Sequence, residues 1–235
     1  MPRYQTVLLD ADNTLFDFNA SEELALHAVL RDRGYTPDER TVNIYLQINS
    51  ALWDAFARGE VKQEFLLVER FRRFEQAMGG NNDPERFNVD YQKALAANGV
   101  LFPGAEELCR SLSAAGCALA IVTNGATIAQ KGRFYASPLA QIIPHLFISQ
   151  EIGVGKPDPL FFDHVCRTMK IVDRSTVVVV GDSLSSDILG GNQAGIDTIW
   201  YNPQGKVPDG PARPTHIAFS LHDVEKIVCG EGDKL

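Results

Sequence analysis

The stretch Tyr4-Gln-Thr-Val-Leu-Leu9 runs directly into Asp10-Ala-Asp-Asn-Thr14. The first part predicts a buried β-strand, and the second places two carboxylates, one residue apart, where that strand ends. Side chains at positions i and i+2 of a strand point to the same side, so Asp10 and Asp12 can face one small volume. One carboxylate could then attack a substrate while its neighbour donates a proton. The same residues also suit a turn or a helix cap, so this stretch alone does not establish a catalytic site.

The chain beyond Gly99 alternates short apolar or β-branched runs with helical patterns, which is typical of a parallel sheet with helices on both faces. Residues 176–180 form the strongest candidate strand, because four consecutive valines suit a central, buried position. We therefore expect an α/β fold built on a doubly wound parallel sheet. The predicted strands are residues 4–9, 118–122, 146–149, 176–180 and 198–201, and the predicted helices are residues 105–115, 128–135, 160–169 and 186–194.

The residues between the first strand and residue 100 predict four long amphipathic helices. Ser21 indicates the start of the first helix and Gly34 its end. Thr36-Pro-Asp-Glu39 predicts a capping box with proline at the first position of the second helix, which continues to Gly59. The third and fourth helices are predicted over residues 62–78 and 85–97, with residue 61 as an alternative start for the third.

This change in pattern also predicts two domains. We expect residues 1–16 and 100–235 to form the sheet-based core and residues 17–99 to form a helical cap inserted into it. Ligands of open parallel sheets bind beyond the carboxyl ends of the strands, near the point where the strand order reverses. A cap that leaves the chain beside Asp10 and Asp12 could exclude water from this place and contact the substrate.

The composition excludes several classes of partner. The 235-residue chain has a formal net charge of −8, which makes long nucleic acid or an anionic membrane surface a poor partner. No apolar run approaches the roughly 18 residues that span a bilayer, and no signal peptide precedes the first strand. The cysteines lack zinc-ligand spacing, so we expect buried thiols and a cytoplasmic location. They are Cys109, Cys117, Cys166 and Cys229.

Three further polar clusters occur where the predicted strands end. Thr123-Asn-Gly125 follows the second strand, and Gly155-Lys-Pro-Asp-Pro159 follows the third. Gly181-Asp-Ser183 follows the fourth, with Asp187 a few residues beyond. Each cluster also has an ordinary explanation, as a turn, a solvated loop lysine or a helix cap. Their joint occurrence, in this order and each at a strand end, favours one shared site, because the carboxyl ends of parallel strands meet at one edge of the sheet.

These clusters resemble the four motifs of the haloacid dehalogenase-like (HAD) superfamily. The matching residues are Asp10-x-Asp12-x-Thr14, Thr123, Lys156 and Gly181-Asp182-x4-Asp187. The helical insertion resembles the C1-type cap of the superfamily, so the resemblance covers essentially the whole chain and implies a Rossmann-like core. The narrower likeness is to the YjjG-type pyrimidine 5′-nucleotidases, which dephosphorylate nucleoside 5′-monophosphates. It rests on residues 10–16, 52–53, 122–125 and 181–191.

The resemblance implies a phosphomonoesterase that works through an aspartyl-phosphate. Asp10 would be the nucleophile, and Asp12 would protonate the leaving oxygen and then activate water. Thr123 and Asn124 would bind the phosphoryl group, and Lys156 would neutralise the charge on it and on Asp10.

The resemblance also implies a magnesium cofactor. The carboxylates of Asp10 and Asp182 and the backbone carbonyl of Asp12 would hold Mg²⁺, which prefers a few protein oxygens together with water and phosphate. Asp187 would orient metal-bound water molecules from just outside these ligands.

The expected substrate is a small phosphorylated metabolite, a nucleoside 5′-monophosphate with a pyrimidine base. Phe16, Phe18 and Trp53 are candidate contacts to the base from the cap side. Trp53 and Phe56 also fit the apolar stripe of the second helix, which favours core packing for both. Phe16 and Phe18 leave the first strand toward the cap and are therefore nearer to a substrate.

Other functions remain open at this point. The alternatives are a sugar-phosphate or phosphoglycolate phosphatase, a phosphomutase, a dehalogenase and a non-catalytic binding module. The acid at Asp12 argues against a dehalogenase, because a halide leaves without a proton. The complete set of catalytic positions argues against a binding module. The sequence does not define the preferred base or sugar, or the oligomeric state.

Overall fold

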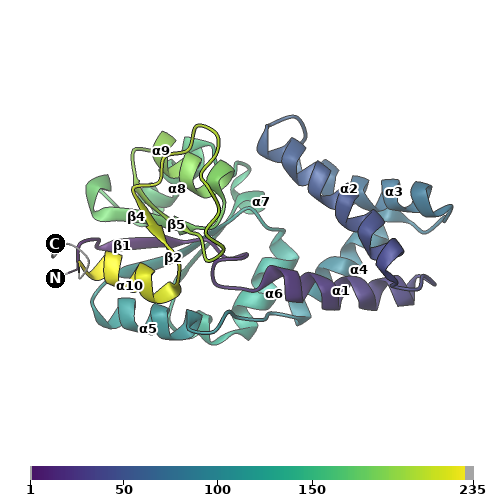
Figure 1. Ribbon diagram of the computed structural model, residues 1–235, viewed down its shortest axis with the longest axis horizontal. Helices are drawn as coiled ribbons and strands as arrows, with labels where there is room; N and C mark the ends of the chain where they lie inside the picture. The colour runs from purple at the N-terminus through teal and green to yellow at the C-terminus, as the bar shows by residue number, and fades with distance from the viewer. Residues whose placement is uncertain (1, 231–235) are drawn as a thin grey trace.

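The computed structural model describes residues 2–230 and consists of a sheet-based core joined to a helical insertion (Figure 1). Within these residues the core contains one six-stranded sheet, in the order β3-β2-β1-β4-β5-β6, and all neighbouring strands are parallel. The predicted doubly wound parallel sheet is therefore confirmed. The strands are β1 (Thr6–Leu9), β2 (Ala118–Thr123), β3 (His145–Ile148), β4 (Val177–Gly181), β5 (Asp197–Tyr201) and β6 (His216–Ala218).

The strand order reverses beside β1. The chain builds β1, β2 and β3 outward on one side, then crosses over to place β4, β5 and β6 on the other. The switch point therefore lies between β1 and β4, where open α/β sheets bind their ligands. Asp10 follows β1 and Asp182 follows β4, so both residues lie at this point.

Helices cover both faces of the sheet. Helices α5 (Ala105–Ala114) and α10 (Leu221–Cys229) lie on one face, and α8 (Pro159–Thr168) and α9 (Leu189–Gln193) lie on the other (Figure 1). Val7 and Leu9 pack with the first pair, whereas Leu8 packs with the second. This alternation along β1 is the reason why every residue of the strand is apolar or buried.

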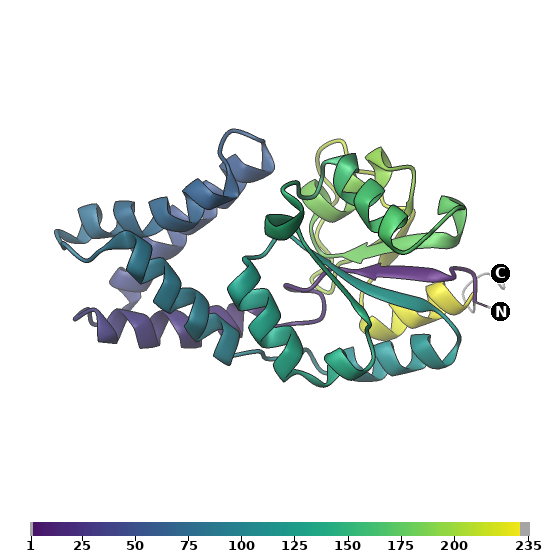
Figure 2. The same cartoon turned by 180° about the vertical axis from the view of Figure 1, so that it is seen from behind.

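Four long helices form the insertion between β1 and α5, and we call them the cap. Their bounds are α1 (Phe18–Asp32), α2 (Glu39–Ala57), α3 (Gln63–Met78) and α4 (Pro84–Ala97). They enclose their own hydrophobic cluster, which includes Tyr45, Phe71 and Phe87. Figure 2 shows the cap standing beside the core rather than wrapped around it.

Helix α6 (Thr127–Ala136) of the core packs directly against helix α4 of the cap (Figure 2). Gly132 permits this close approach, because a Cβ atom at that position would lie 2.3 Å from the Cβ of Ala96. Ala129 joins the hydrophobic cluster of the cap. The side chains of α6 can therefore contact both domains.

Two predicted helix starts are wrong. Asp17, not Ser21, caps α1 and accepts a hydrogen bond from the backbone N–H of Ala20, whereas Ser21 lies buried within the helix. Asp38, not Thr36, caps α2, so the predicted capping box with a proline at the first helical position is absent. Serine, threonine and aspartate are all favoured helix caps, so the sequence alone did not distinguish them.

All five predicted strands are present, with ends that differ by at most two residues. The sequence did not predict β6, α10, α7 (Ser149–Ile152) or the short 3₁₀ helices over 138–141 and 174–176. The predicted helix 186–194 begins earlier, as a π-helix over Leu184–Ile188 that continues into α9. Residue 1 and residues 231–235 of the expected core lie outside the described residues.

Two expectations from composition can be compared with the structure. None of the helices within residues 2–230 combines the length and apolarity needed to cross a bilayer. Cys109, Cys117 and Cys166 are buried thiols, as predicted. Cys229 is partly exposed instead, because it lies in the last turn of α10 at the edge of the core.

Candidate active site

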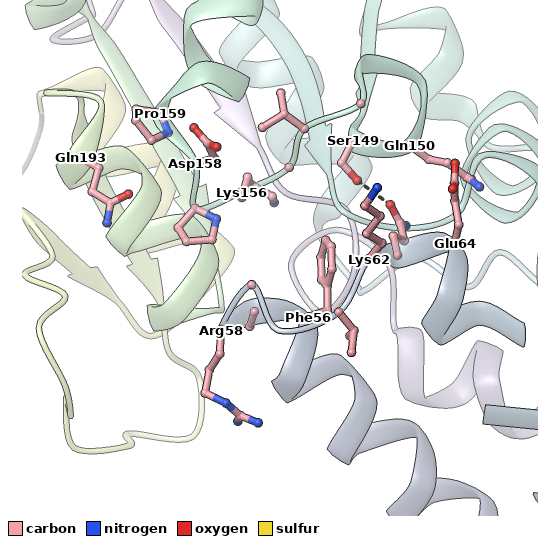
Figure 3. A pocket seen from close by; sticks show the side chains of 18 residues that line it. Phe56, Arg58, Lys62, Glu64, Ser149, Gln150, Lys156, Asp158, Pro159 and Gln193 are labelled. Atoms are coloured by element: carbon pink, nitrogen blue, oxygen red, sulfur yellow. Dashed lines mark hydrogen bonds between the residues drawn. The ribbon is translucent and has the colours of Figure 1, made fainter. Parts of the chain in front are cut away.

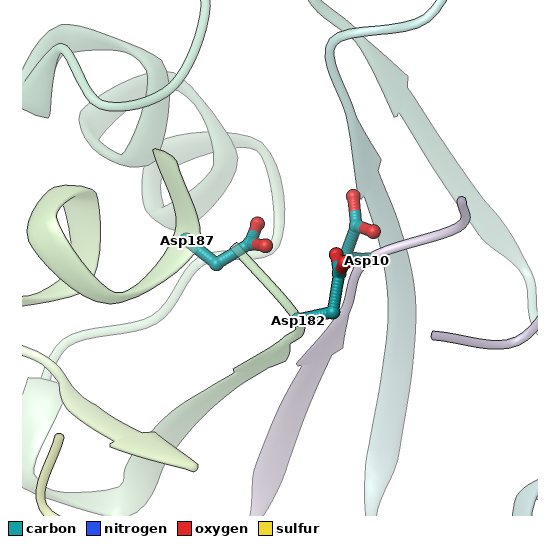
Figure 4. Close-up of side chains that lie close together, drawn as sticks. All are labelled: Asp10, Asp182 and Asp187. Atoms are coloured by element: carbon teal, nitrogen blue, oxygen red, sulfur yellow. The ribbon is translucent and has the colours of Figure 1, made fainter. Parts of the chain in front are cut away.

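Three carboxylates meet at the switch point of the sheet. Asp10 follows β1, Asp182 follows β4, and Asp187 lies in the π-helix after β4 (Figure 4). One oxygen from each carboxylate can be chosen so that all three lie within 4.8 Å of one another. Asp10 and Asp187 are buried, with exposed fractions of 7% and 1%. The parallel strands thus bring together residues that are far apart in the sequence.

Lys156 lies between two of these carboxylates. Its Nζ is 2.6 Å from Oδ1 of Asp10, 2.6 Å from Oδ1 of Asp187 and 2.8 Å from the carbonyl oxygen of Val122. An ammonium group has three N–H donors, and each has an acceptor here. The expected meeting of Lys156 with Asp10 is therefore present, whereas the catalytic roles of both residues stay predictions.

Burial and crowding raise the pKa of the acids in this cluster. Burial raises the pKa of Asp10 well above its ordinary value, and Asp187 and Asp182 raise it further against the opposing effect of Lys156. Burial, followed by the charge of Asp187, raises the pKa of Asp182 to about 7. Burial alone would lower the pKa of Lys156, but Asp10 and Asp187 raise it above its ordinary value. The lysine is therefore charged at neutral pH.

This cluster fits a divalent cation. Three carboxylates surround a single ammonium group, so their full ionisation leaves an excess of negative charge. The pKa values of Asp10 and Asp182 are raised first by burial and then by this repulsion. A divalent cation would remove it, and oxygen donors are the ligands that Mg²⁺ prefers.

Asp12 is held by two residues of α6. Its Oδ2 accepts a hydrogen bond of 2.6 Å from Nε2 of Gln130. Its Oδ1 lies 2.7 Å from Nη2 of Arg133, in an ion pair whose direction does not make a hydrogen bond. Both α6 residues are buried, and sequence reasoning missed them. Gln130 and Arg133 are three residues apart and lie on the same face of α6 as Ala129. This spacing was the signal in the sequence that could have indicated their burial.

Thr123 and Asn124 follow β2 beside the cluster. Thr123 is buried, and its hydroxyl oxygen accepts a hydrogen bond of 3.0 Å from the N–H of Gly125. The side chain of Asn124 donates to the carbonyl of Lys156 (2.7 Å) and accepts from the N–H of Lys156 (2.9 Å). This pair of hydrogen bonds shows that Asn124 holds the backbone of the lysine in place. Asn124 also lines the same cavity as Asp10, so its expected role in substrate binding stays a prediction.

A cavity of about 320 Å³ opens between the acidic cluster and the cap. The core supplies its charged wall and the cap supplies a mostly apolar wall. From the core it is lined by Asp10, Asp12, Thr123, Lys156, Asp182 and Asp187, and from the cap by Phe18, Trp53, Leu67, Arg70, Gln92 and Leu95.

A larger cavity of about 870 Å³ lies between the α2–α3 turn of the cap and the loop 153–159 of the core (Figure 3). Lys156 lines both cavities. Of these two cavities, the smaller one is lined by Asp10, Asp12 and Asp182, and the larger one is not. The smaller cavity is therefore the candidate active site, because the predicted catalytic residues line it.

The candidate aromatic contacts divide between the cavity and the core. Phe18 and Trp53 line the smaller cavity, as expected for residues near a substrate. Phe16 does not line it; it is 1% exposed and packs in the core under α5, so its prediction as a substrate contact is wrong. The backbone of Phe16 forms isolated β-bridges with Asp12 and with Leu101. Phe56 lines the larger cavity and packs edge-on against Trp53.

Known proteins resemble the chain over nearly its whole length. The family model of the haloacid dehalogenase-like hydrolases matches residues 4–195. The pyrimidine 5′-nucleotidase PynA of Streptococcus pneumoniae is 35% identical over 221 residues, which cover 94% of this chain and 93% of PynA. The pyrimidine 5′-nucleotidase YjjG of Escherichia coli is 32% identical over 228 residues, which cover 97% of this chain and 99% of YjjG.

A solved structure has the same arrangement of core and cap. The HAD hydrolase YfnB of Bacillus subtilis, in a crystal form bound to magnesium, aligns with a TM-score of 0.90 and 31% identity. The alignment covers 96% of this chain and 99% of the YfnB chain. The four motifs, the strand-end cluster and these likenesses agree: the chain belongs to the haloacid dehalogenase-like hydrolases.

Proposed function

We propose that this protein is a Mg²⁺-dependent phosphomonoesterase that hydrolyses nucleoside 5′-monophosphates, preferring pyrimidines, through an aspartyl-phosphate on Asp10. The observation that carries the proposal is the position of Lys156, whose Nζ lies 2.6 Å from Asp10 beside a cavity that the cap covers. The names of PynA and YjjG, relatives that are 35% and 32% identical, support the nucleotide as substrate.

Asp10 would attack the phosphorus atom and release the nucleoside. The carboxylate is buried beside Lys156, whose charge would offset the negative charge of the phosphoryl oxygens as the substrate enters. The hydroxyl oxygen of Thr123 accepts from Gly125, so its own proton is available to a phosphoryl oxygen. The resulting aspartyl-phosphate divides the hydrolysis into two easier steps.

Asp12 would transfer the protons. It would first protonate the departing 5′ oxygen of the nucleoside and then take a proton from the water that attacks the aspartyl-phosphate. The contacts with Gln130 and Arg133 keep its carboxylate at the entrance from the cap, where the leaving group must lie.

The metal would lie at the acidic cluster. Asp10, Asp182 and the backbone carbonyl of Asp12 would hold Mg²⁺, with Asp187 close to these ligands. When bound, Mg²⁺ supplies positive charge that aligns and neutralises the phosphoryl oxygens. The proposal also assigns residues 17–99 to the cap domain and places the enzyme in the cytoplasm, where its buried thiols would stay reduced.

A kinetic screen tests the proposal. The full-length protein would be assayed with Mg²⁺ or with EDTA on UMP, dTMP, CMP, AMP and GMP, and on glucose 6-phosphate, phosphoglycolate, phosphoserine and p-nitrophenyl phosphate. We expect EDTA to abolish turnover, and a pyrimidine monophosphate to have a kcat/KM at least about tenfold above every non-nucleotide ester. A hexose phosphate that surpasses every nucleotide would overturn the nucleotidase assignment. The absence of Mg²⁺-dependent turnover of any ester would overturn the phosphatase assignment.

A further inference from the structure

Gln92 of α4 presents a polar atom without a partner to the catalytic cavity. The residue is 4% exposed and lines the same cavity as Asp10. Among the described residues, no hydrogen-bond donor contacts its Oε1 atom. A buried amide oxygen is unfavourable without a donor, so this atom indicates a ligand that brings one.

The neighbours of Gln92 determine which end of its amide faces the cavity. Arg70 is buried and can only donate, and its Nη2 lies 3.0 Å from Oδ1 of Asn88. The same Oδ1 atom accepts from Nε2 of Gln92 over 3.3 Å. Because Asn88 must turn its oxygen toward Arg70, Gln92 must turn its nitrogen toward Asn88. Its oxygen is therefore left as the acceptor.

A network through all four cap helices holds Arg70 in place. Nη1 of Arg70 donates to Oδ1 of Asn49 on α2 over 3.1 Å, and the Asn49 amide donates to Glu22 on α1 over 3.2 Å. Tyr91 of α4 donates to the same Glu22 oxygen over 3.0 Å. Networks of this kind are rigid when each member is paired. The orientation of Gln92 is thus a property of the whole cap.

The surroundings of Gln92 suit a flat ring. Phe18, Trp53 and Leu67 line the cavity beside it and can pack against the faces of a ring but not against sugar hydroxyls. From the core side, Nε and Nη1 of Arg133 also line the cavity, and no acceptor contacts them among the described residues. On the core side, Oδ1 of Asp12 and Oδ1 of Asn13 are further acceptors without a hydrogen bond in the described part of the chain, so Gln92 Oε1 is the unpaired acceptor that the cap brings to the cavity. A uracil or thymine ring offers one imide N–H between two carbonyls, which matches this acceptor and the donors of Arg133.

We propose that Gln92 reads the base of the substrate by accepting a hydrogen bond from the imide N3–H of a uracil or thymine ring. This inference rests on the proposed nucleotidase function and names the part of the nucleotide that the cap recognises. A cytosine ring brings an amino group with two N–H donors, of which the single Gln92 oxygen can pair one. Arg70 and Asn88 act as positioning residues, because their hydrogen bonds fix the orientation of Gln92; Arg70 also lines the cavity.

A substrate and a residue can be altered together to test this contact. The substrates are UMP, 3-methyluridine 5′-monophosphate, which lacks the N3 proton, and p-nitrophenyl phosphate, which has no base. The variants are Gln92→Ala and Gln92→Met, the second of which keeps the volume without the acceptor. Gln76→Ala, on the exposed face of α3, is the control.

We expect the wild-type enzyme and the control to lose on the order of 10- to 100-fold in kcat/KM when N3 is methylated. In both Gln92 variants the two nucleotides should differ by less than about threefold, because the residue that distinguishes them is gone. Turnover of p-nitrophenyl phosphate should stay at the wild-type value in the Gln76→Ala control, and in the Gln92 variants it should not show the loss that UMP shows.

Two outcomes would overturn the inference. One is wild-type turnover of 3-methyluridine monophosphate as fast as of UMP, and the other is an undiminished methylation penalty in the Gln92 variants, whether or not both nucleotides react more slowly. Failure of the proposed function looks different: the wild-type enzyme would hydrolyse p-nitrophenyl phosphate but prefer no nucleotide. If Gln92→Ala lowers the melting temperature strongly, the Gln92→Met variant decides the comparison.

Discussion

Asp187 Oδ1 accepts a hydrogen bond over 2.6 Å from Lys156 Nζ, the same nitrogen that donates to Asp10. The other oxygen of Asp187 accepts from the N–H of Ser183 over 3.1 Å. Asp187 is thus held at both oxygens, and it holds the lysine in turn. The sequence predicts Asp187 to orient metal-bound water. Its contact with Lys156 gives Asp187 a second role. The ammonium group keeps its position because both Asp10 and Asp187 accept hydrogen bonds from it.

Replacement of Asp187 by Asn should therefore weaken catalysis without removing a group that touches the substrate. An amide nitrogen cannot accept a hydrogen bond, so either Lys156 or Ser183 loses its acceptor. We expect kcat/KM for p-nitrophenyl phosphate to fall about 10- to 100-fold. Asp209→Asn, at an exposed position, is the matched control. Wild-type kinetics for Asp187→Asn would show that Lys156 does not depend on this contact.

Asp10→Asn should abolish phosphatase activity, because an amide does not form the acyl phosphate. We expect kcat to fall by at least about 10⁴-fold, with the melting temperature equal to or above that of the wild type. Stability should not suffer, since burial raises the pKa of Asp10 and makes its charge unfavourable in the folded protein. Acid-quenched wild-type enzyme should carry phosphate from a labelled substrate, and the variant should not. Phosphate retained by the variant would place the covalent intermediate on another residue.

The pKa of Asp182 gives a prediction on stability. In the folded protein it is raised from 3.8 to about 7, first by burial and then by Asp187. Below about pH 4 this acid is protonated in both the folded and unfolded states and has no effect on stability. As the pH rises toward 7, the unfolded chain ionises first, so the free energy of unfolding decreases. Above pH 7 the loss stays constant.

Asp182→Asn removes that loss. In EDTA at pH 8 the variant should be more stable than the wild type by on the order of 2 to 4 kcal/mol in urea unfolding, and the difference should vanish near pH 4. Mg²⁺ should stabilise the wild type more than the variant, because the metal binds ionised Asp182. Equal stability of both proteins at pH 8 would show that the Asp182 charge is already compensated without metal.

Residue types and spacing were enough to predict the sheet and the strand-end cluster. The valines of β4 favour a central strand over a helix, and parallel strands bring Asp10 and Asp182 to one edge regardless of loop details. The ends of helices were harder, since Ser21 and Asp17 are both good caps and only the folded backbone chooses between them. Helix α10 was missed although Leu221, Val224 and Val228 have helical spacing.

The residues that face the site from the cap and from α6 could not be predicted from the sequence in the same way. Gln92, Gln130 and Arg133 are polar residues on helices, and such residues normally face water. Their burial results from the packing of α4 against α6, which depends on tertiary contacts such as that of Gly132 with Ala96. A sequence motif identifies the residues that are expected to perform the chemistry. Substrate contacts from the cap depend instead on how the cap packs against the core.

Gln63, the first residue of α3, joins the cap to the core. Its Nε2 donates to the carbonyl of Asn124 over 2.7 Å, and its Oε1 accepts from the hydroxyl of Ser149 over 3.1 Å. The side chain is 8% exposed, so water competes little with either bond. Asn124 in turn holds the backbone of Lys156. The position of the cap is thereby connected to Lys156.

Gln63→Ala should release this contact and favour an open cap. We expect KM for nucleotides to rise about 3- to 10-fold, because two buried hydrogen bonds between cap and core contribute roughly 1 kcal/mol each. Amide hydrogen exchange at the start of α3 should become faster, while exchange within β1 and β4 stays unchanged. Gln76→Ala lies on the same helix in an exposed position and should change neither quantity. If Gln63→Ala leaves KM and exchange at the values of this control, closure of the cap is set by the packing of α4 on α6 alone.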